Sequence, residues 1–136
     1  MITALDTNVL FDILLSSPRF CDASEQALEN AAAAGGLVIC DVVYAELCVH
    51  FTRQKEAERF LEENEIRVES LERSAGFLAS QVWRRYRQGG GKRDRILTDF
   101  LIGAHAQTQA AQLISRDRGF YRPYFHALKV IDPSME

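Results

Sequence analysis

Residues 1–11 read MITALDTNVLF, and this opening stretch predicts the fold. Ile2–Leu5 is a short apolar run, typical of a strand that is covered on both faces, and a helical pattern begins at Thr7. The single charge in the stretch is Asp6, at the point where the strand gives way to the helix. Open α/β sheets bind their substrates at the carboxyl ends of the strands, so the stretch indicates both a parallel sheet and a site at its edge.

The same alternation of short apolar runs and longer helical stretches continues to the C-terminus. Four further runs have strand character, namely Leu37–Cys40, Ile66–Val68, Gln112–Ser115 and Leu128–Ile131. Helical patterns lie between them, including Lys55–Glu65 and the stretch after Glu72. This order predicts an α/β fold with a parallel sheet and helices on both of its faces. No repeat or linker marks a second domain, so residues 1–136 are expected to form one domain.

Composition places the chain among globular proteins. It is 47% hydrophobic and 26% charged, and no apolar run approaches the ~18 residues of a membrane span. The N-terminus lacks the basic segment and cleavage site of a signal peptide. We therefore expect a cytoplasmic protein with no membrane partner. Its three cysteines have no ligand-like spacing, which favours reduced core residues over disulfides.

Charge is distributed unevenly along the chain, although the net charge is only −3. Residues 1–51 carry seven acids and one arginine, whereas residues 74–136 carry ten basic residues and five acids. Six of those basic residues lie in RRYRQGGGKRDR, from Arg84 to Arg95. This segment is either a solvated helix end and loop or a phosphate-binding patch. Trp83 and Tyr86, which interleave with its first arginines, form either a base-stacking surface or, as their helical spacing favours, a packing surface.

Four acids occupy unusual positions in the sequence. Three are the only charges in long apolar stretches, MITALDTNVLF, VVYAELCVHF and ILTDFLIGAHA, and the fourth follows the apolar run LIS: Asp6, Glu46, Asp99 and Asp117. An unpaired buried carboxylate costs about 3–5 kcal/mol, and converging carboxylates repel one another unless a cation neutralises them. Oxygen ligands of this kind suit Mg²⁺ or Mn²⁺. The pattern therefore favours a metal-dependent phosphoryl-transfer site.

Each acid also has an ordinary structural interpretation. Asp6 is placed to cap a helix, the helix dipole favours Asp99, and a turn accounts for Asp117. Glu46 has the weakest such interpretation, because it lies in mid-helix with no lysine or arginine nearby in the sequence. Asp12, in contrast, is expected on the outer surface of its helix.

Several segments together resemble the PIN-domain nucleases, and specifically the VapC toxins of bacterial toxin–antitoxin pairs. They are ALDTNVLFD, YAEL, LTDFLIGAHA, and LISRDRGFYRPYF leading to LKVIDP, and they follow the order of that family over nearly the whole chain. The resemblance implies a PIN-like three-layer α/β/α fold with a central parallel sheet of about five short strands.

The resemblance also implies a metal-dependent endoribonuclease toxin. Catalysis and binding of Mg²⁺ or Mn²⁺ would fall to Asp6, Glu46, Asp99 and Asp117, with Asn8 and Ser115 in support. The basic residues expected at the RNA backbone are Arg93, Arg95, Arg116 and Arg118. Expected partners are a VapB-like antitoxin, which presents Arg or Lys to the acids, and a second copy of the chain.

Two alternatives stay open. One is a PIN module that binds RNA or protein without catalysis. The other is an aspartyl-phosphate-type phosphatase with Asp6 as the nucleophile, although Asn8 stands where such enzymes usually carry a second aspartate.

Overall fold

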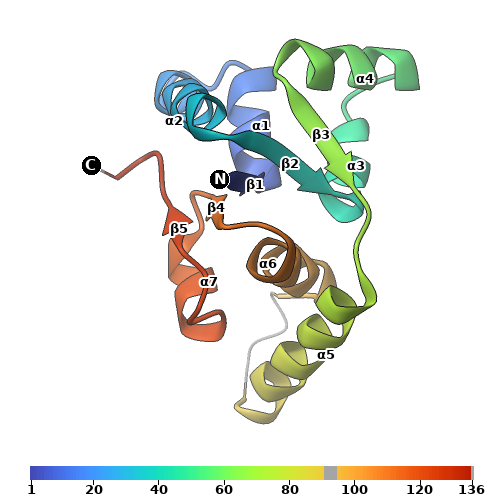
Figure 1. Ribbon diagram of the computed structural model, residues 1–136, viewed down its shortest axis with the longest axis vertical. Helices are drawn as coiled ribbons and strands as arrows, with labels where there is room; N and C mark the ends of the chain where they lie inside the picture. The colour runs from blue at the N-terminus through green and yellow to red at the C-terminus, as the bar shows by residue number, and fades with distance from the viewer. Residues whose placement is uncertain (91–94, 136) are drawn as a thin grey trace.

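A computed structural model of the chain describes residues 1–90 and 95–135, and its strands and helices alternate as the sequence predicts (Figure 1). The strands are β1 (Ile2–Leu5), β2 (Gly36–Cys40), β3 (Ile66–Glu69), β4 (Gln112–Ile114) and β5 (Val130–Ile131). The helices are α1 (Thr7–Leu14), α2 (Cys21–Ala34), α3 (Asp41–Cys48), α4 (Gln54–Glu63), α5 (Arg73–Gln88), α6 (Leu97–Gln109) and α7 (Arg118–Tyr124).

The five strands form one sheet in the order β3-β2-β1-β4-β5, and every neighbouring pair is parallel. The expected parallel sheet is confirmed, with small differences at strand ends. Leu5 pairs with Ile114, so β1 and β4 end at the same height. Asp6 and Ser115, the next residue after each strand, therefore begin side by side at the carboxyl edge.

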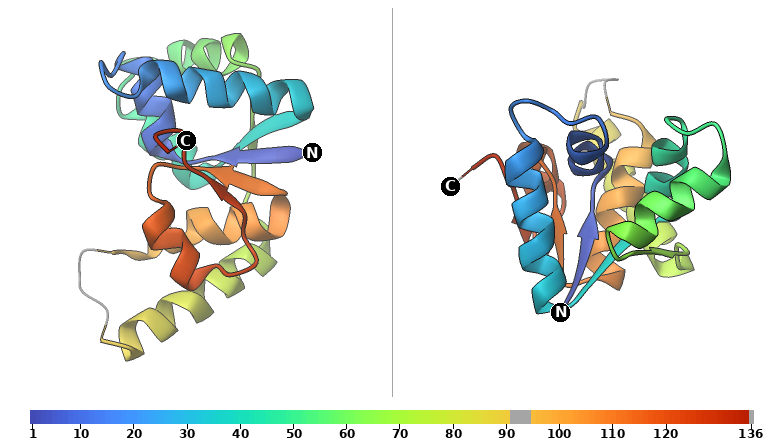
Figure 2. Two further views of the ribbon diagram at one scale, coloured as in Figure 1. Left: turned by 90° about the vertical axis from the view of Figure 1, so that its left-hand side faces the viewer. Right: turned by 90° about the horizontal axis from the view of Figure 1, so that it is seen from above.

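Helices cover both faces of the sheet, which confirms the three-layer arrangement (Figure 2). In the left view α1, α2 and α4 lie above the strands, and α5, α6 and α7 lie below them. Residues of the central strands are buried because both of their faces are covered; Leu5, Val38 and Leu113 are 0–1% exposed. No helix of the described ranges is long and apolar enough to cross a membrane.

An aromatic cluster holds α6 against α7. The ring of Phe100 lies 5.2 Å from that of Phe120 and 5.9 Å from that of Tyr124, both edge to face. Such pairs contribute about 0.5–1.5 kcal/mol beyond the area they bury. Phe100 directly follows Asp99, and Phe120 lies three residues after Asp117, so this packing fixes the helix starts that carry the two acids.

Candidate active site at the carboxyl edge of the sheet

Three of the four predicted acids lie at the N-terminal ends of helices. Asp6 is the N-cap of α1, Asp117 is the N-cap of α7, and Asp99 lies in the first turn of α6. Asp6 and Asp117 also follow neighbouring strands, and the backbone N–H of Asp6 donates to Ile114 O at 3.0 Å. The positive ends of helix dipoles favour negative charge. The helix ends at this edge therefore offset part of the cost of burying carboxylates there, and they would also favour a bound anion.

Asp6 is the buried centre of the site. Its carboxylate is 7% exposed and accepts hydrogen bonds from Thr7 N (2.7 Å), Ser115 Oγ (2.8 Å) and Tyr121 Oη (2.8 Å). Burial raises the pKa of Asp6, these hydrogen bonds lower it, and the nearby charge of Glu46 raises it further, with a net upward shift. A cation beside Asp6 would oppose that shift.

Tyr121 belongs to the site although the sequence patterns did not single it out. It is 2% exposed, and burial, followed by the charge of Asp6, raises its pKa well above the ordinary value of 10.0. The charges of Asp99 and Asp117 raise that pKa in the same direction. Its hydroxyl therefore stays protonated and donates to Asp6. The available signal was its spacing, since Tyr121 lies one helical turn after Asp117.

Glu46 reaches the site from α3. Its carboxylate accepts a hydrogen bond from Thr7 Oγ1 at 2.5 Å, which places it beside the start of α1. Glu46 is exposed, so the burial expected from its apolar surroundings in the sequence is wrong. The buried residues of α3 are Val43 and Leu47, and Glu46 lies at the side of that buried stripe, where it is open to solvent.

Asp99 and Asp117 each have a donor of their own within the protein. Asp99 Oδ2 accepts from the backbone N–H of Ile96 at 3.1 Å, a capping bond at the start of α6. Asp117 accepts two hydrogen bonds from the Arg95 guanidinium, at 2.7 and 3.3 Å. The Arg95 guanidinium also lies 4.4 Å from the centroid of the Phe120 ring. One positive charge of the chain therefore already neutralises one of the four acids.

The four carboxylates gather around Asp6 and Tyr121 without closing into a tight ligand set. Among the described residues, the one group of three potential ligand side chains with all ligand atoms within 4.8 Å is Cys21, Asp22 and Glu25. That group lies on one turn of α2, where both acids are exposed. The four acids at the sheet edge still fit a hard divalent cation chemically, because they offer only carboxylate oxygens.

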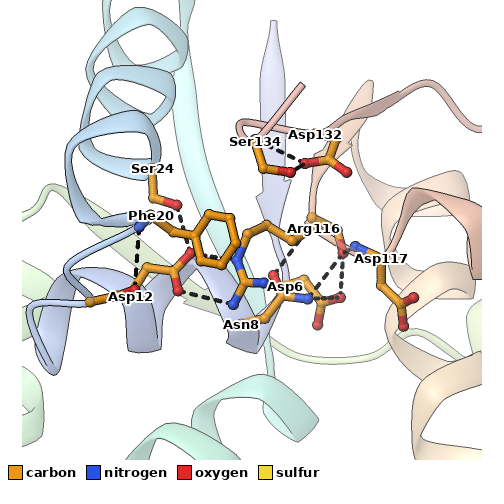
Figure 3. A network of polar contacts seen from close by, with 11 residues as sticks. Asp6, Asn8, Asp12, Phe20, Ser24, Arg116, Asp117, Asp132 and Ser134 are labelled. Carbon is orange, nitrogen blue, oxygen red and sulfur yellow. Dashed lines mark hydrogen bonds and ion pairs between the residues drawn. The ribbon is translucent and has the colours of Figure 1, made fainter. Parts of the chain in front are cut away.

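Asn8 and Ser115 link Asp6 to the turn that carries Arg116 and Asp117, and Figure 3 shows Asn8 between them. Ser115 Oγ donates to Asp6 and accepts from the backbone N–H of Asp117 at 2.9 Å. Asn8 Nδ2 lies 3.3 Å from Ser115 Oγ, and Asn8 Oδ1 accepts from the backbone N–H of Arg116 at 3.2 Å. Both residues therefore hold the turn after β4 against the start of α1.

A second, buried cluster supports the same turn from the other side. Asp12 is 3% exposed, so its expected position on the helix surface is wrong. Its carboxylate accepts two bonds from the Arg116 guanidinium, at 2.7 and 3.0 Å, and one from Ser24 Oγ at 2.8 Å. Arg116 also lies 4.0 Å from the centroid of the Phe20 ring (Figure 3).

The arginines predicted to contact RNA therefore differ in their surroundings. Arg95 and Arg116 are engaged by acids of the protein, and Arg118 Nη2 lies 3.2 Å from Met135 Sδ. Arg93 lies outside the described residues. RNA contact by any of these arginines stays a prediction.

Comparison with known proteins gives a family and a fold. The PIN domain family model matches residues 3–126. A chain of the VapBC2 complex from Rickettsia felis is 20% identical, with 96% of this chain and 98% of that chain covered at a TM-score of 0.75. A chain of VapBC-1 from nontypeable Haemophilus influenzae is 18% identical, with 99% of this chain and 100% of that chain covered at a TM-score of 0.72. A chain of FitAcB from Neisseria gonorrhoeae is 20% identical, with 98% of each chain covered at a TM-score of 0.66. No curated protein sequence matches.

Proposed function

Because this chain belongs to the PIN domain family, we propose that it is a metal-dependent endoribonuclease and the VapC-like toxin of a toxin–antitoxin pair. The observation that carries the proposal is the convergence of Asp6, Glu46, Asp99 and Asp117 at the carboxyl edge of β1 and β4. The toxin role is supported by solved structures of similar fold that are toxin–antitoxin or VapBC complexes. Residues 1–136 would act as a single PIN domain in the cytoplasm.

Asp6 and Asp99 would hold a Mg²⁺ or Mn²⁺ ion jointly, and Glu46 and Asp117 would complete a metal pair or bind through water. Such an ion supplies a more acidic water and positive charge for the transition state of phosphodiester hydrolysis. Attack by water would leave 5′-phosphate and 3′-hydroxyl ends and would not require the 2′-hydroxyl of RNA.

The chain's own residues prepare the site for this chemistry. Tyr121, Ser115 and the N–H of Thr7 donate to Asp6, which favours its ionised form and fixes its orientation. Thr7 fixes Glu46 in the same way. Because Tyr121 stays protonated, it serves as a donor and not as a base. The network therefore presents carboxylates in one arrangement before any ligand arrives.

Inhibition would come from a VapB-like antitoxin whose tail places an arginine among the acids. A planar guanidinium suits this role because it binds a carboxylate through two hydrogen bonds. Arg95 on Asp117 is an example of that geometry within this chain. Helices α4 and α5 are candidate surfaces for the antitoxin and for a homodimer.

The decisive experiment measures RNA cleavage by the purified chain with Mn²⁺, with Mg²⁺ and with EDTA. We expect cleavage with either metal, none in EDTA, and none for Asp6→Asn or Asp99→Asn. Glu62→Gln, an exposed position of α4, is the matched control and should cleave normally. Full activity in EDTA or in both site variants would refute the nuclease.

Two further measurements address the toxin role and the alternative of a non-catalytic module. Expression of the chain alone should arrest growth, and the Asp6→Asn variant should not. Arrest that persists in Asp6→Asn would refute the toxin role. A folded chain that binds RNA but shows neither cleavage nor Asp6-dependent Mn²⁺ binding would favour the module.

A further inference from the structure

A hollow on the outer face of α5 lies away from the four acids. It has a volume of about 450 Å³, within the usual range for pockets that bind small organic groups. Its lining residues are Ser80, Gln81, Trp83, Arg84, Arg87 and Gln88. We refer to these six residues as the α5 hollow. An aromatic ring, two cations and two amides in one place match the chemistry of a nucleobase and its phosphates.

Trp83 provides the aromatic surface of the α5 hollow. It is half-buried, and the Arg87 guanidinium lies 5.3 Å from its ring centroid. Its indole Nε1–H is buried and has no acceptor among the described residues. Tyr86 differs, since it is 7% exposed and packs 5.2 Å from the Phe100 ring. Only Trp83 of this pair is therefore available to a ligand.

Within the part of the chain that the structure describes, the positive charges beside Trp83 have no acidic partners. Arg84, Arg85 and Arg87 are exposed, and none forms an ion pair with any residue in 1–90 or 95–135. Arg95 and Arg116, in contrast, each bind an aspartate. Unpaired cations on an acidic chain are suited to a ligand that brings negative charge.

The position of the α5 hollow allows one strand of RNA to reach both it and the acids. In the left view of Figure 2, the carboxyl ends of the strands and the C-terminal end of α5 face the same side of the molecule. Gln88, at the end of α5, precedes Asp99 by only eleven residues. The C-terminal end of α5, which carries two of the hollow's residues, Arg87 and Gln88, therefore lies on the same side of the molecule as the carboxyl ends of the strands.

We propose that the α5 hollow binds a base of single-stranded RNA stacked on Trp83, with Arg84 and Arg87 at the adjacent phosphates. This inference rests on the proposed ribonuclease function and identifies a substrate-binding surface outside the acidic centre. A second copy of the chain docked face to face would bring the same arginines together, so charge favours a polyanion over a homodimer here.

The test uses the fact that Trp83 is the only tryptophan of the chain. A short oligouridine RNA is titrated into the full chain in EDTA, and Trp83 fluorescence and the anisotropy of a labelled RNA are followed over a salt series. We expect quenching that parallels binding. The double variant Arg84→Ala/Arg87→Ala should lower the slope of log K against log salt by about 1.4, or about 0.7 for each phosphate.

The matched control removes two charges from α4, at the opposite end of the molecule in Figure 1. Lys55→Ala/Arg59→Ala also replaces two exposed cations of one helix, and it should leave the salt slope unchanged. Trp83→Ala should weaken binding by roughly five-fold or more, the lower bound for loss of one base stack. If Trp83→Ala does not fold, the arginine variant still decides, because both of its sites are exposed.

Several outcomes would overturn the proposal. These are RNA binding without a change in Trp83 fluorescence, equal losses in the α5 and α4 variants, and no RNA binding at low salt. Loss of self-association in the α5 variant, with RNA binding intact, would identify the face as an interface between copies. If RNA quenches Trp83 fluorescence but no Mn²⁺-dependent cleavage occurs, RNA binding at the α5 hollow is supported and the nuclease function is refuted. If cleavage depends on Mn²⁺ but RNA does not quench Trp83 fluorescence, the nuclease function is supported and RNA binding at the α5 hollow is refuted.

Discussion

Replacing Arg116 with alanine is expected to destabilise the protein more than any surface change should. The substitution removes both hydrogen bonds from the guanidinium to Asp12, whose side chain is only 3% exposed. Loss of one partner from a buried ion pair costs about 3–5 kcal/mol. Arg116 is 27% exposed and Ser24 still donates to Asp12, so the lower end, about 3 kcal/mol, applies.

This cost is a large part of the ~5–15 kcal/mol that stabilises a typical domain. At about 3–4 °C per kcal/mol for a chain of this size, the melting temperature should fall by roughly 10 °C. Urea and thermal melts followed by circular dichroism measure both quantities. The fold should survive in the cold, because Asn8 bonds to the backbone of Arg116 and not to its side chain.

A double variant separates the buried charge from general loss of packing. Asp12→Leu/Arg116→Met removes both charges and keeps apolar volume, so most of the lost stability should return. The reasoning would be refuted if Arg116→Ala cost less than about 1 kcal/mol, the scale of a surface ion pair. It would also fail if the double variant were as unstable as Arg116→Ala.

Three further predictions concern the acids themselves. Burial raises the pKa of Asp6 in the folded protein above its ordinary value of 3.8. The stability that protonated Asp6 contributes to folding is therefore fully present below pH 3.8 and is lost as the pH rises through the folded-state pKa. Asp6→Asn should therefore raise the melting temperature at neutral pH in EDTA, with a gain that shrinks in acid; a constant gain would contradict this. Arg95→Ala releases Asp117, so calorimetry should show Mn²⁺ binding up to roughly five-fold tighter, given about 1 kcal/mol for a part-exposed ion pair. Unchanged or weaker binding would refute that competition. Tyr121→Phe removes a hydrogen bond that lowers the pKa of Asp6, so the acid limb of the cleavage pH profile should move to higher pH, and an unmoved limb would argue against it.

The fold was largely predictable because its signals are local. Apolar runs such as Ile2–Leu5 and Leu37–Cys40 have strand length, and the alternation with helices leaves few topologies. The buried stripe of α5 also follows directly from helical spacing, since Ala75, Ala79 and Val82 are 0% exposed. Strand ends were less predictable, and β5 begins at Val130, two residues later than expected.

The surroundings of the site residues were less predictable because their partners are distant in sequence. Asp12 pairs with an arginine 104 residues away, so no local pattern distinguishes it from a surface acid. Tyr121 donates a hydrogen bond to Asp6, which lies 115 residues earlier in the sequence. In its local sequence, next to Phe120, Tyr121 resembles a core aromatic residue and not a hydrogen-bond donor of the site. For Glu46 the error is the opposite one, since a residue expected to be buried is exposed. Apolar neighbours along a helix do not bury a side chain that faces solvent.

The same limit decides which cations can meet RNA. In the sequence, Arg84 to Arg95 is one continuous basic segment, and Arg116 appears equally available. In the structure Asp117 binds Arg95 and Asp12 binds Arg116, whereas the arginines of α5 bind no acid among the described residues. Because an ion pair must be given up before a phosphate can bind, contacts by Arg95 or Arg116 carry a cost that those by Arg84 and Arg87 do not. The first phosphates to bind should therefore lie along α5, and the salt slope should respond more to Arg84→Ala or Arg87→Ala alone than to Arg95→Ala.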